Sequence, residues 1–292
     1  MELRLLRYFT AVVQEGNITR AADKLCITQP TLSRQLAQLE EELGASLLDR
    51  SHKSIELTND GALLYQQALD ILELADKTER EFRNSSEHID GTITIGATES
   101  AGSMVLPELI GNFSRLYPRA AYDLYSGYTD DIKEKIDKGI VDIGILTEPV
   151  EITKYDYVKL PQEDFWGIMV RSDDPLAERK AVSFSDIIDR PLMMPRRESV
   201  RSEIKSWFRD SSRLNIFATY NVVSNAALLV QKGLATALCL NSIGSFRQSE
   251  DLIFIPFTEM KYVGSVLIWK KNYMYSPTTT RFLDMVKDTY RA

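Results

Sequence analysis

A short stretch of the chain places hydroxyl, amide and guanidinium groups at helical spacing. Within residues 28–43, Leu32, Leu36 and Leu39 share one helical face. Arg34 lies about 200° from Leu32 around that helix, at about 100° per residue. The outward surface of the first two turns is therefore small, polar and basic, and it consists of Gln29, Pro30, Thr31, Ser33 and Arg34. Such groups hydrogen-bond to base edges and phosphates in a DNA major groove about 12 Å wide.

Each polar side chain of this surface suits a group on DNA. The guanidinium of Arg34 fits either a guanine edge or a phosphate, and the amide of Gln29 fits adenine. Thr31 and Ser33 offer hydroxyls to bases or phosphates. The alternative is an ordinary solvated helix face. The short preceding helix with its alanine pair at 21–22, and the basic segment that follows, favour DNA.

Three predicted helices position this surface. Apolar spacing predicts helices over 2–15, 19–25 and 28–43. Thr28 is the expected N-cap of the third helix, and Gly44 ends it. Short helices packed through such apolar stripes, with tight turns between them, form an all-α helix-turn-helix.

A hairpin is predicted after the third helix. Residues 47–58 lose helical periodicity, and Arg50, His52 and Lys53 lie near the expected tip. The hairpin would be the wing of a winged helix-turn-helix, and its basic tip would contact DNA.

A long linker helix is predicted over 59–88. Its apolar residues follow a heptad spacing, and the seam consists of Leu64, Ala68, Ile71, Ala75, Thr78 and Phe82. Because a free-standing helix of this length needs a partner for its seam, we expect a second copy of the chain there.

From residue 90 onward, strands and helices alternate. This alternation predicts a parallel sheet with right-handed crossovers, arranged as two α/β lobes. The expected strands are 92–97, 121–127, 141–146, 166–170, 192–194, 215–222, 235–240 and 265–269. The expected helices are 102–116, 129–138, 183–188, 200–209, 225–232 and 277–290.

A ligand site is predicted between these lobes. Ligands of open α/β sheets bind at the carboxyl ends of strands, where helix N-termini present free N–H groups. For any one residue there, helix capping is the alternative role, particularly for Thr129 and Ser224. The predicted site residues are Thr98, Glu99, Ser100, Ala101, Thr129, Leu146, Thr147, Arg196, Arg197, Ser199, Ser224 and Asn225.

The charged members of that set point to different ligand chemistries. Arg196 and Arg197 favour a carboxylate, whereas Glu99 favours an amino group. A zwitterionic ligand would satisfy both signs of charge. The alternative is that these side chains face water.

The sequence offers few residues that could form a catalytic or metal-binding site. The only histidines are His52 and His88, so the α/β region has none for a Ser–His–Asp triad. No His/Cys cluster has metal-ligand spacing, and GATESAG lacks the ending of a phosphate loop. Cys26 and Cys239 are predicted to be core residues. No catalytic residue, metal or cofactor is expected.

Length and composition predict the number of domains and the cellular compartment of the protein. The chain has 292 residues, 44% hydrophobic and 26% charged, which is typical of a globular protein with two or three domains. Its two cysteines fit a reducing compartment. The N-terminal apolar stretch carries charges unlike a signal peptide, and no long apolar run is present, so we expect a cytoplasmic protein without a membrane partner. A net charge of −7 does not exclude DNA, since a small basic face is sufficient.

The same residues carry a family resemblance. The run AA-x-x-L, then TQPTLSRQLAQLEEELG, LL-x-R and LTNDG closely resembles the LysR-type transcriptional regulators over about residues 3–61. TITIGA, GIVDIGI, DPLA and VQKGLATAL are similar to that family's effector domain, so the resemblance covers essentially the whole chain. Leu48 departs from the phenylalanine common in the family, which we expect to affect packing rather than DNA.

The resemblance implies site residues and partners. By their motif positions, Gln29, Pro30, Thr31, Ser33 and Arg34 match the DNA-reading helix, Arg50 and Lys53 the wing, and Thr19 and Arg20 positions near phosphates, with Thr28 beside them. The linker helix resembles the family's dimerising helix, and such regulators assemble as dimers of dimers. The two lobes resemble a periplasmic-binding-protein-like (type 2) effector domain with a small-molecule inducer between them. RNA polymerase is a further partner within reach of a promoter-bound regulator.

These observations predict a sequence-specific transcriptional regulator controlled by a small-molecule effector, and not an enzyme. The predicted parts are a winged helix-turn-helix over 1–58, a linker helix over 59–89 and an effector domain over 90–292. Lobe I comprises about 90–161 and 266–292, and lobe II about 162–265. The alternative is a cytoplasmic small-molecule-binding protein or α/β enzyme whose helical N-terminus serves only for oligomerisation.

Overall fold

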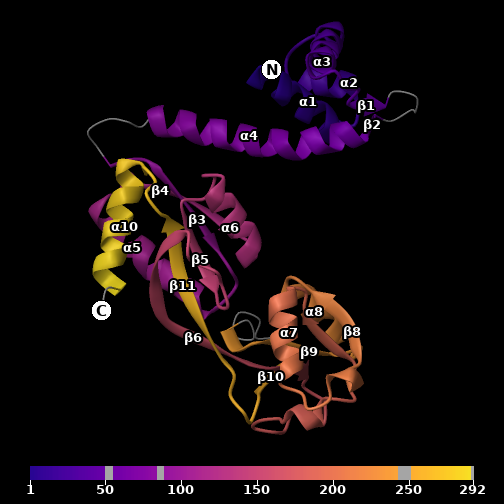
Figure 1. The fold of residues 1–292 in the computed structure, drawn as a ribbon, viewed down its shortest axis with the longest axis vertical. Helices are drawn as coiled ribbons and strands as arrows, with labels where there is room; N and C mark the ends of the chain where they lie inside the picture. The colour runs from indigo at the N-terminus through magenta and orange to yellow at the C-terminus, as the bar shows by residue number, and fades with distance from the viewer. Residues whose placement is uncertain (50–54, 84–88, 243–250, 291–292) are drawn as a thin grey trace. The chain divides into compact units, whose positions relative to one another are not determined.

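The structure, a computed structural model, describes residues 1–49, 55–83, 89–242 and 251–290, without the side chains of residues 81–83. The predicted wing residues Arg50 and Lys53 and both histidines lie outside the described residues, as does the side chain of Phe82. The chain forms two compact units, Met1–Ser85 and Ser86–Ala292 (Figure 1).

Three short helices form the core of the N-terminal unit. They are α1 (Leu3–Glu15), α2 (Ile18–Lys24) and α3 (Gln29–Leu43), close to the ranges predicted from apolar spacing. Their buried stripes meet in one cluster, which contains Leu5, Phe9, Val12, Ala21, Ala22, Leu32, Leu36 and Leu39. The predicted helix-turn-helix is therefore confirmed.

The turn between α2 and α3 corrects one prediction. Cys26 has a φ of 55°, in the left-handed region, and its side chain is exposed rather than in the core. The backbone N–H of Ile27 donates to the carbonyl of Ala22 at 3.0 Å, which closes the end of α2. Apolar composition alone favoured burial of Cys26, but the tight turn directs its side chain to solvent.

A small antiparallel hairpin follows α3, as predicted. Its strands β1 (Leu48–Asp49) and β2 (Glu56–Leu57) pair directly. Leu48 is 4% exposed and belongs to the helical core, so its departure from the family pattern affects packing. The next helix packs closely, since a Cβ on Gly61 would lie 2.0 Å from the carbonyl oxygen of Leu47.

The long helix α4 (Asn59–Arg83) uses its apolar residues differently from the prediction. Ala68 and Leu72 pack against Leu6 of α1, within the same chain. Part of the predicted seam is thus covered internally, because α1 lies along this helix. Ile71 remains 37% exposed, and Leu63 and Leu74 beside it are 58% and 38% exposed.

The C-terminal unit contains a nine-stranded sheet in the order β4-β3-β5-β11-β6-β9-β7-β8, with β10 also paired to β6. Its strands are β3 (Thr92–Ala97), β4 (Ala121–Ser126), β5 (Ile143–Thr147), β6 (Tyr155–Arg171), β7 (Leu192–Pro195), β8 (Ile216–Tyr220), β9 (Thr236–Leu240), β10 (Leu252–Pro256) and β11 (Tyr262–Lys270). The helices are η1 (Ala101–Val105), α5 (Leu106–Leu116), α6 (Thr129–Asp137), η2 (Phe184–Asp186), α7 (Glu198–Ser206), η3 (Ser211–Arg213), α8 (Val223–Gln231) and α10 (Pro277–Tyr290).

The sheet is mixed, which corrects the prediction of a parallel one. β4, β3 and β5 are parallel to one another, as are β8, β7 and β9. Between these groups run β6 and β11, which are antiparallel to each other and to their other neighbours. The periodicity of 166–170 revealed only the buried end of β6, because its first half alternates between buried and exposed residues.

Two lobes result from this arrangement, and β6 and β11 run from one lobe to the other (Figure 1). β6 pairs with β11 over Tyr155–Phe165, with a register shift after Leu160, and with β9 and β10 over Trp166–Arg171. Each lobe has its own apolar clusters, with α5 and α10 on one face of the first sheet and α6 on the other. The strand ends that face the gap between the lobes therefore come from both halves.

Candidate DNA-reading helix and ligand cavity

Helix α3 presents its small polar side chains outward. Thr28, Gln29, Pro30, Thr31 and Arg34 are exposed, and Ser33 is half-buried. Thr28 is the N-cap residue of α3, as predicted, although its hydroxyl lies 2.8 Å from the hydroxyl of Thr31 and makes no capping hydrogen bond. Gln29 Nε2 donates to Ser33 Oγ at 2.8 Å.

Arg34 supplies the positive charge of this surface. Within the part of the chain that the structure describes, its guanidinium makes no hydrogen bond or ion pair. All five of its N–H donors are available to a ligand. The neighbouring hydroxyls and the amide are already paired, Thr28 with Thr31 and Gln29 with Ser33.

The N-terminus of α2 lies beside two further predicted contacts, Thr19 and Arg20, which are both exposed. Asn17 caps this helix, since its Oδ1 accepts from the backbone N–H of Thr19 at 2.9 Å and of Arg20 at 3.1 Å. The Arg20 guanidinium donates to the carbonyl of Glu15. The sequence analysis missed Asn17, although an asparagine before a helix is a common N-cap signal.

A cavity of about 630 Å³ lies between the two lobes of the C-terminal unit. Six of the predicted residues line it, and they are Thr98, Glu99, Thr129, Thr147, Arg196 and Arg197. This volume is in the range of small-molecule sites, about 300–1,000 Å³. The carboxyl ends of the parallel strands thus converge on one space, as the topology requires.

A second cavity of about 380 Å³ adjoins the first. The two share Thr98, Glu99, Tyr125, Ser126 and Val223 as lining residues. The predicted residues Ser100 and Ser224 line this second cavity only. Neither Thr129 nor Ser224 stands at an N-cap, since α6 and α8 are preceded by Tyr128 and Val222, so a capping role is wrong for both.

Four predicted residues line neither cavity, and they are Ala101, Leu146, Ser199 and Asn225. Leu146 is fully buried and packs among α6 and β11 side chains, because alternation along β5 turns it away from Thr147. Ser199 and Asn225 are exposed.

The loop after β3 is held by hydroxyl contacts. Thr98 Oγ1 lies 2.9 Å from Thr147 Oγ1 and 3.2 Å from Ser100 Oγ. Gly102 fits here because a Cβ would lie 2.5 Å from Cβ of Ser265 on β11. These contacts fix the position of Thr98 at the edge of the cavity.

A buried carboxylate connects this loop to the other lobe. Asp164, on β6, is fully buried, and its Oδ2 accepts from the backbone N–H of Ala101 at 2.7 Å. Its Oδ1 accepts from the backbone N–H of Ser242, beyond β9, at 3.1 Å. One side chain on the crossover strand thus joins lobe I to lobe II.

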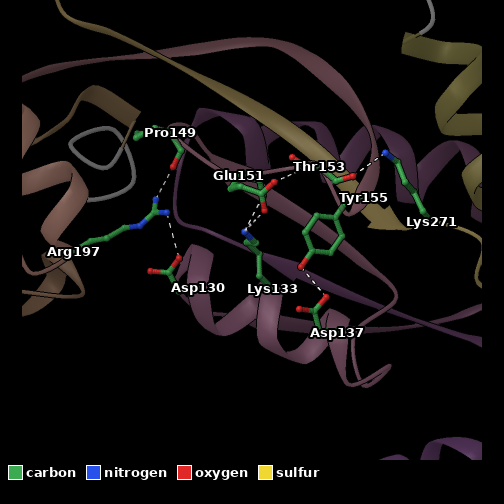
Figure 2. A network of polar contacts seen from close by, with 9 residues as sticks. All are labelled: Asp130, Lys133, Asp137, Pro149, Glu151, Thr153, Tyr155, Arg197 and Lys271. Atoms are coloured by element: carbon green, nitrogen blue, oxygen red, sulfur yellow. Dashed lines mark hydrogen bonds and ion pairs between the residues drawn. The ribbon is translucent and has the colours of Figure 1, made fainter.

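Arg197 forms a second connection between the lobes (Figure 2). From the second lobe it donates to the carbonyl of Pro149 at 3.0 Å and to Asp130 Oδ1 at 3.3 Å. The loop that carries Pro149 is itself fixed, since Lys133 Nζ donates to the carbonyl of Glu151 at 2.8 Å. Arg197 is therefore engaged in holding the lobes together.

Tyr128 lies among charged groups of the cavity. Burial is the main cause that raises the pKa of its phenol, and Asp131 and Glu99 raise it further, whereas Arg196 lowers it. The phenol is consequently neutral near pH 7 and serves as a hydrogen-bonding group. Glu99 and Arg196 thus act on the same hydroxyl from the same cavity.

Other kinds of site are not seen in the described residues. In residues 1–49, 55–83, 89–242 and 251–290, no His, Cys, Asp and Glu side chains are grouped so that they could hold a metal ion. Over the same ranges, no helix is both long and apolar enough to span a bilayer.

Two family models match the chain in succession. The "Bacterial regulatory helix-turn-helix protein, lysR family" model matches residues 3–62. The "LysR substrate binding domain" model matches residues 86–291. This chain belongs to the LysR family of transcriptional regulators. The alternative of an enzyme or binding protein with helices for oligomerisation only is therefore wrong.

One curated relative of this LysR-family regulator matches nearly its whole length, and another matches about two thirds of it. The chain is 31% identical over 296 residues to the Hca operon transcriptional activator HcaR of Escherichia coli (strain K12), which covers 99% of this chain and 98% of that protein. It is 35% identical over 196 residues to the HTH-type transcriptional regulator BenM of Acinetobacter baylyi (strain ATCC 33305 / BD413 / ADP1), covering 66% of this chain and 64% of that protein.

Solved structures of LysR regulators have the same fold. CbnR, a LysR family transcriptional regulator, superposes with a TM-score of 0.80 at 26% identity and covers 100% of both chains. Full-length CbnR in complex with its target DNA superposes with a TM-score of 0.78 at 25% identity, covering 99% of this chain and 100% of that one.

The sequence analysis of this LysR regulator missed the aromatic part of its cavity. Tyr125, Tyr128, Trp166 and Tyr220 line the main cavity, and none was predicted. Tyr125 and Tyr128 lie at the end of a predicted strand, in the run YSGY, and that position could have indicated them. Trp166 could not be found this way, because it comes from the middle of the long antiparallel strand β6.

Proposed function

We propose that α3 enters the DNA major groove and that its exposed polar surface contacts the bases. The main support for this proposal is that the Arg34 guanidinium has no partner among the described residues. It lies beside the paired side chains of Thr31, Gln29 and Ser33. Thr28 and Pro30 complete this surface. Thr19 and Arg20, at the N-terminus of α2, are proposed to contact phosphates through the Thr19 hydroxyl and the Arg20 guanidinium, since both side chains are exposed.

Further DNA contacts follow from the proposed division of the chain. In this division, residues 1–58 form the DNA-binding domain, 59–89 the linker and 90–292 the effector domain. Within the effector domain, lobe I comprises about 90–161 and 266–292, and lobe II comprises about 162–265. Arg50 and Lys53 are proposed to contact DNA from the wing. RNA polymerase is a proposed further partner at the promoter. Because its DNA lies in the cytoplasm, the protein is expected to work there.

The linker helix α4 is proposed to pair with a second copy of the chain, and two dimers to form a tetramer. Support comes from three of its exposed apolar residues, Leu63, Ile71 and Leu74, which are 58%, 37% and 38% exposed. At about 100° per residue these three lie within about 80° of one another, on a side that α1 leaves uncovered. Such a stripe on an amphipathic helix favours a helix partner.

Replacing Leu74 by glutamate is expected to weaken this dimer at least about 100-fold. Dimerisation removes Leu74 of both copies from water, and burial of each side chain contributes about 1.5–3 kcal/mol to the free energy of association. The substitution removes this contribution and places two carboxylates in the apolar contact. Sedimentation equilibrium over a range of protein concentrations measures the change. Leu69→Glu, which places a carboxylate at a 40% exposed leucine at least about 120° from this stripe around α4, is the matched control and should stay dimeric. A Leu74→Glu protein as dimeric as the control would contradict this interface.

The effector is proposed to bind in the cavity between the lobes, in contact with Thr98, Glu99, Thr129, Thr147 and Arg196. Ligand binding would favour one relative position of the lobes, and the assembly would shift the spacing or bend of the bound DNA. Such a response requires that the ligand bind the two assembly states with different affinity.

Selection of genomic DNA fragments by the purified full-length protein, read by sequencing at moderate salt, tests the proposal. The expected result is enrichment of an interrupted palindrome, because a symmetric dimer reads two half-sites. Affinity for a recovered site should fall steeply with salt, by about 10³-fold between 50 and 200 mM if six or more phosphates are contacted. A folded, dimeric protein that enriches no sequence with or without added cell metabolites would overturn it.

A further inference from the structure

The main cavity carries more negative than positive charge. Four carboxylates line it against two guanidinium groups, and these residues are Glu99, Asp130, Asp131, Glu148, Arg196 and Arg197. A ligand with carboxylates only would add negative charge to a space that already has an excess of it. A ligand with a cationic group is favoured by the same electrostatics.

Several of these charges are already accounted for. Arg197 and Asp130 form an ion pair at 3.3 Å. Asp131 lies in the first turn of α6, where the N-terminal helix dipole stabilises a carboxylate. Glu148, by contrast, has no ion pair among the described residues, but it is half-buried beside Gly264, where a Cβ would lie 2.5 Å from Glu148 Oε2.

Glu99 and Arg196 are exposed charges of opposite sign in the lining, and a ligand in the cavity can reach them. Over the described ranges, neither side chain has a hydrogen bond or ion pair, although both line the cavity. Both also act electrostatically on the phenol of Tyr128, with opposite effects on its pKa. A carboxylate and a guanidinium, both exposed and both without a partner among the described residues, therefore lie near the same tyrosine of the cavity.

The remaining lining is apolar and aromatic. Trp166, Val200, Val223 and Leu240 line the main cavity, and Trp166 is 6% exposed. The adjoining cavity of about 380 Å³ adds further apolar side chains such as Leu106. This lining suits an uncharged hydrocarbon or aromatic group of a ligand, because burial removes apolar surface from water.

We propose that the effector is a zwitterion of the α-amino-acid type with an apolar side chain. Its ammonium group pairs with Glu99, its carboxylate pairs with Arg196, and its side chain packs against the Trp166 and Val223 lining. This assignment rests on the proposed function of the cavity as the effector site.

Matched probe series test the charge requirement. Each series keeps one apolar group and varies the charges: leucine, 4-methylpentanoate and isopentylamine; phenylalanine, 3-phenylpropanoate and 2-phenylethylamine; tryptophan, indole-3-propionate and tryptamine. Affinity for the full-length protein is measured by isothermal titration calorimetry. In at least one series we expect the amino acid to bind about tenfold or more tightly than both analogues, since a charge-assisted hydrogen bond contributes on the order of a factor of ten.

Two variants separate the two charges. Glu99→Gln should weaken the affinity for the amino acid about tenfold and leave the affinity for its acid analogue unchanged. Arg196→Gln should also weaken the affinity for the amino acid about tenfold, but leave the affinity for its amine analogue unchanged. Glu203→Gln and Arg209→Gln, which change equivalent side chains outside both cavities, should leave all affinities unchanged.

The proposal is overturned if, in every series, the acid or the amine binds at least as tightly as the amino acid, or if no amino acid binds. The same protein preparation is assayed for binding to its selected DNA. Intact DNA binding together with either of those outcomes removes the zwitterion assignment and leaves the regulator function standing. Failure of the DNA selection itself counts against the proposed function instead.

Discussion

Replacing Asp164 by alanine is expected to lower the free energy of unfolding of the C-terminal unit by about 3 kcal/mol. The carboxylate is fully buried and accepts the backbone N–H groups of Ala101 and Ser242, at 2.7 and 3.1 Å. Each buried donor left without an acceptor costs about 1–3 kcal/mol. Asp164→Asn keeps one accepting oxygen and should cost about half as much.

Urea unfolding followed by tryptophan fluorescence measures this loss. All three tryptophans, Trp166, Trp207 and Trp269, lie in the C-terminal unit, so the signal reports that unit alone. Asp156→Ala is the matched control, because Asp156 is an exposed aspartate on the same strand and should change stability by less than about 0.5 kcal/mol. If Asp164→Ala is no less stable than this control, the buried bridge between the lobes does not stabilise the unit.

Replacing Arg34 by alanine is expected to weaken binding to the selected DNA site by about 10- to 100-fold. The physical reason is the loss of a guanidinium whose donors have no partner within the described residues, at about 1–3 kcal/mol for a base contact. Fluorescence anisotropy with a labelled operator at fixed salt measures the change.

The same variant distinguishes the two contacts open to Arg34. If it reads guanine, Arg34→Ala should lose discrimination at one base pair of each half-site. If it holds a phosphate, affinity should fall equally on all sequences, and the slope of log affinity against log salt should become shallower by about one. Arg209→Ala, in the C-terminal unit, controls for loss of a positive charge elsewhere. Wild-type affinity in Arg34→Ala would remove α3 from the groove.

Local sequence patterns determined the N-terminal unit almost completely. The leucine spacing of 32, 36 and 39 defines the buried side of α3, and therefore also its outward surface. A helix repeats every 3.6 residues, so neighbouring positions carry all the information needed. Cys26 and the Thr28 hydroxyl are the exceptions, since a tight turn and a side-chain contact with Thr31 decided their orientation.

The seam of α4 shows what a periodic pattern leaves open. Its apolar residues were visible in the sequence, but the pattern does not say which partner covers them. The tertiary structure places α1 over Ala68 and Leu72 and leaves Leu63 and Leu74 exposed. Helices far apart in sequence had to be packed together before the free side could be recognised.

In the C-terminal unit, the tertiary structure decided both the sheet and the cavity. The antiparallel pairing of β6 with β11 joins residues about a hundred positions apart, so no local pattern encodes it. Leu146 and Thr147 are adjacent in sequence, yet strand alternation buries one and turns the other to the cavity. The sequence determined which polar residues stand at strand ends. Only folding decided which of them share one space, because their neighbours there come from distant strands and from the opposite lobe.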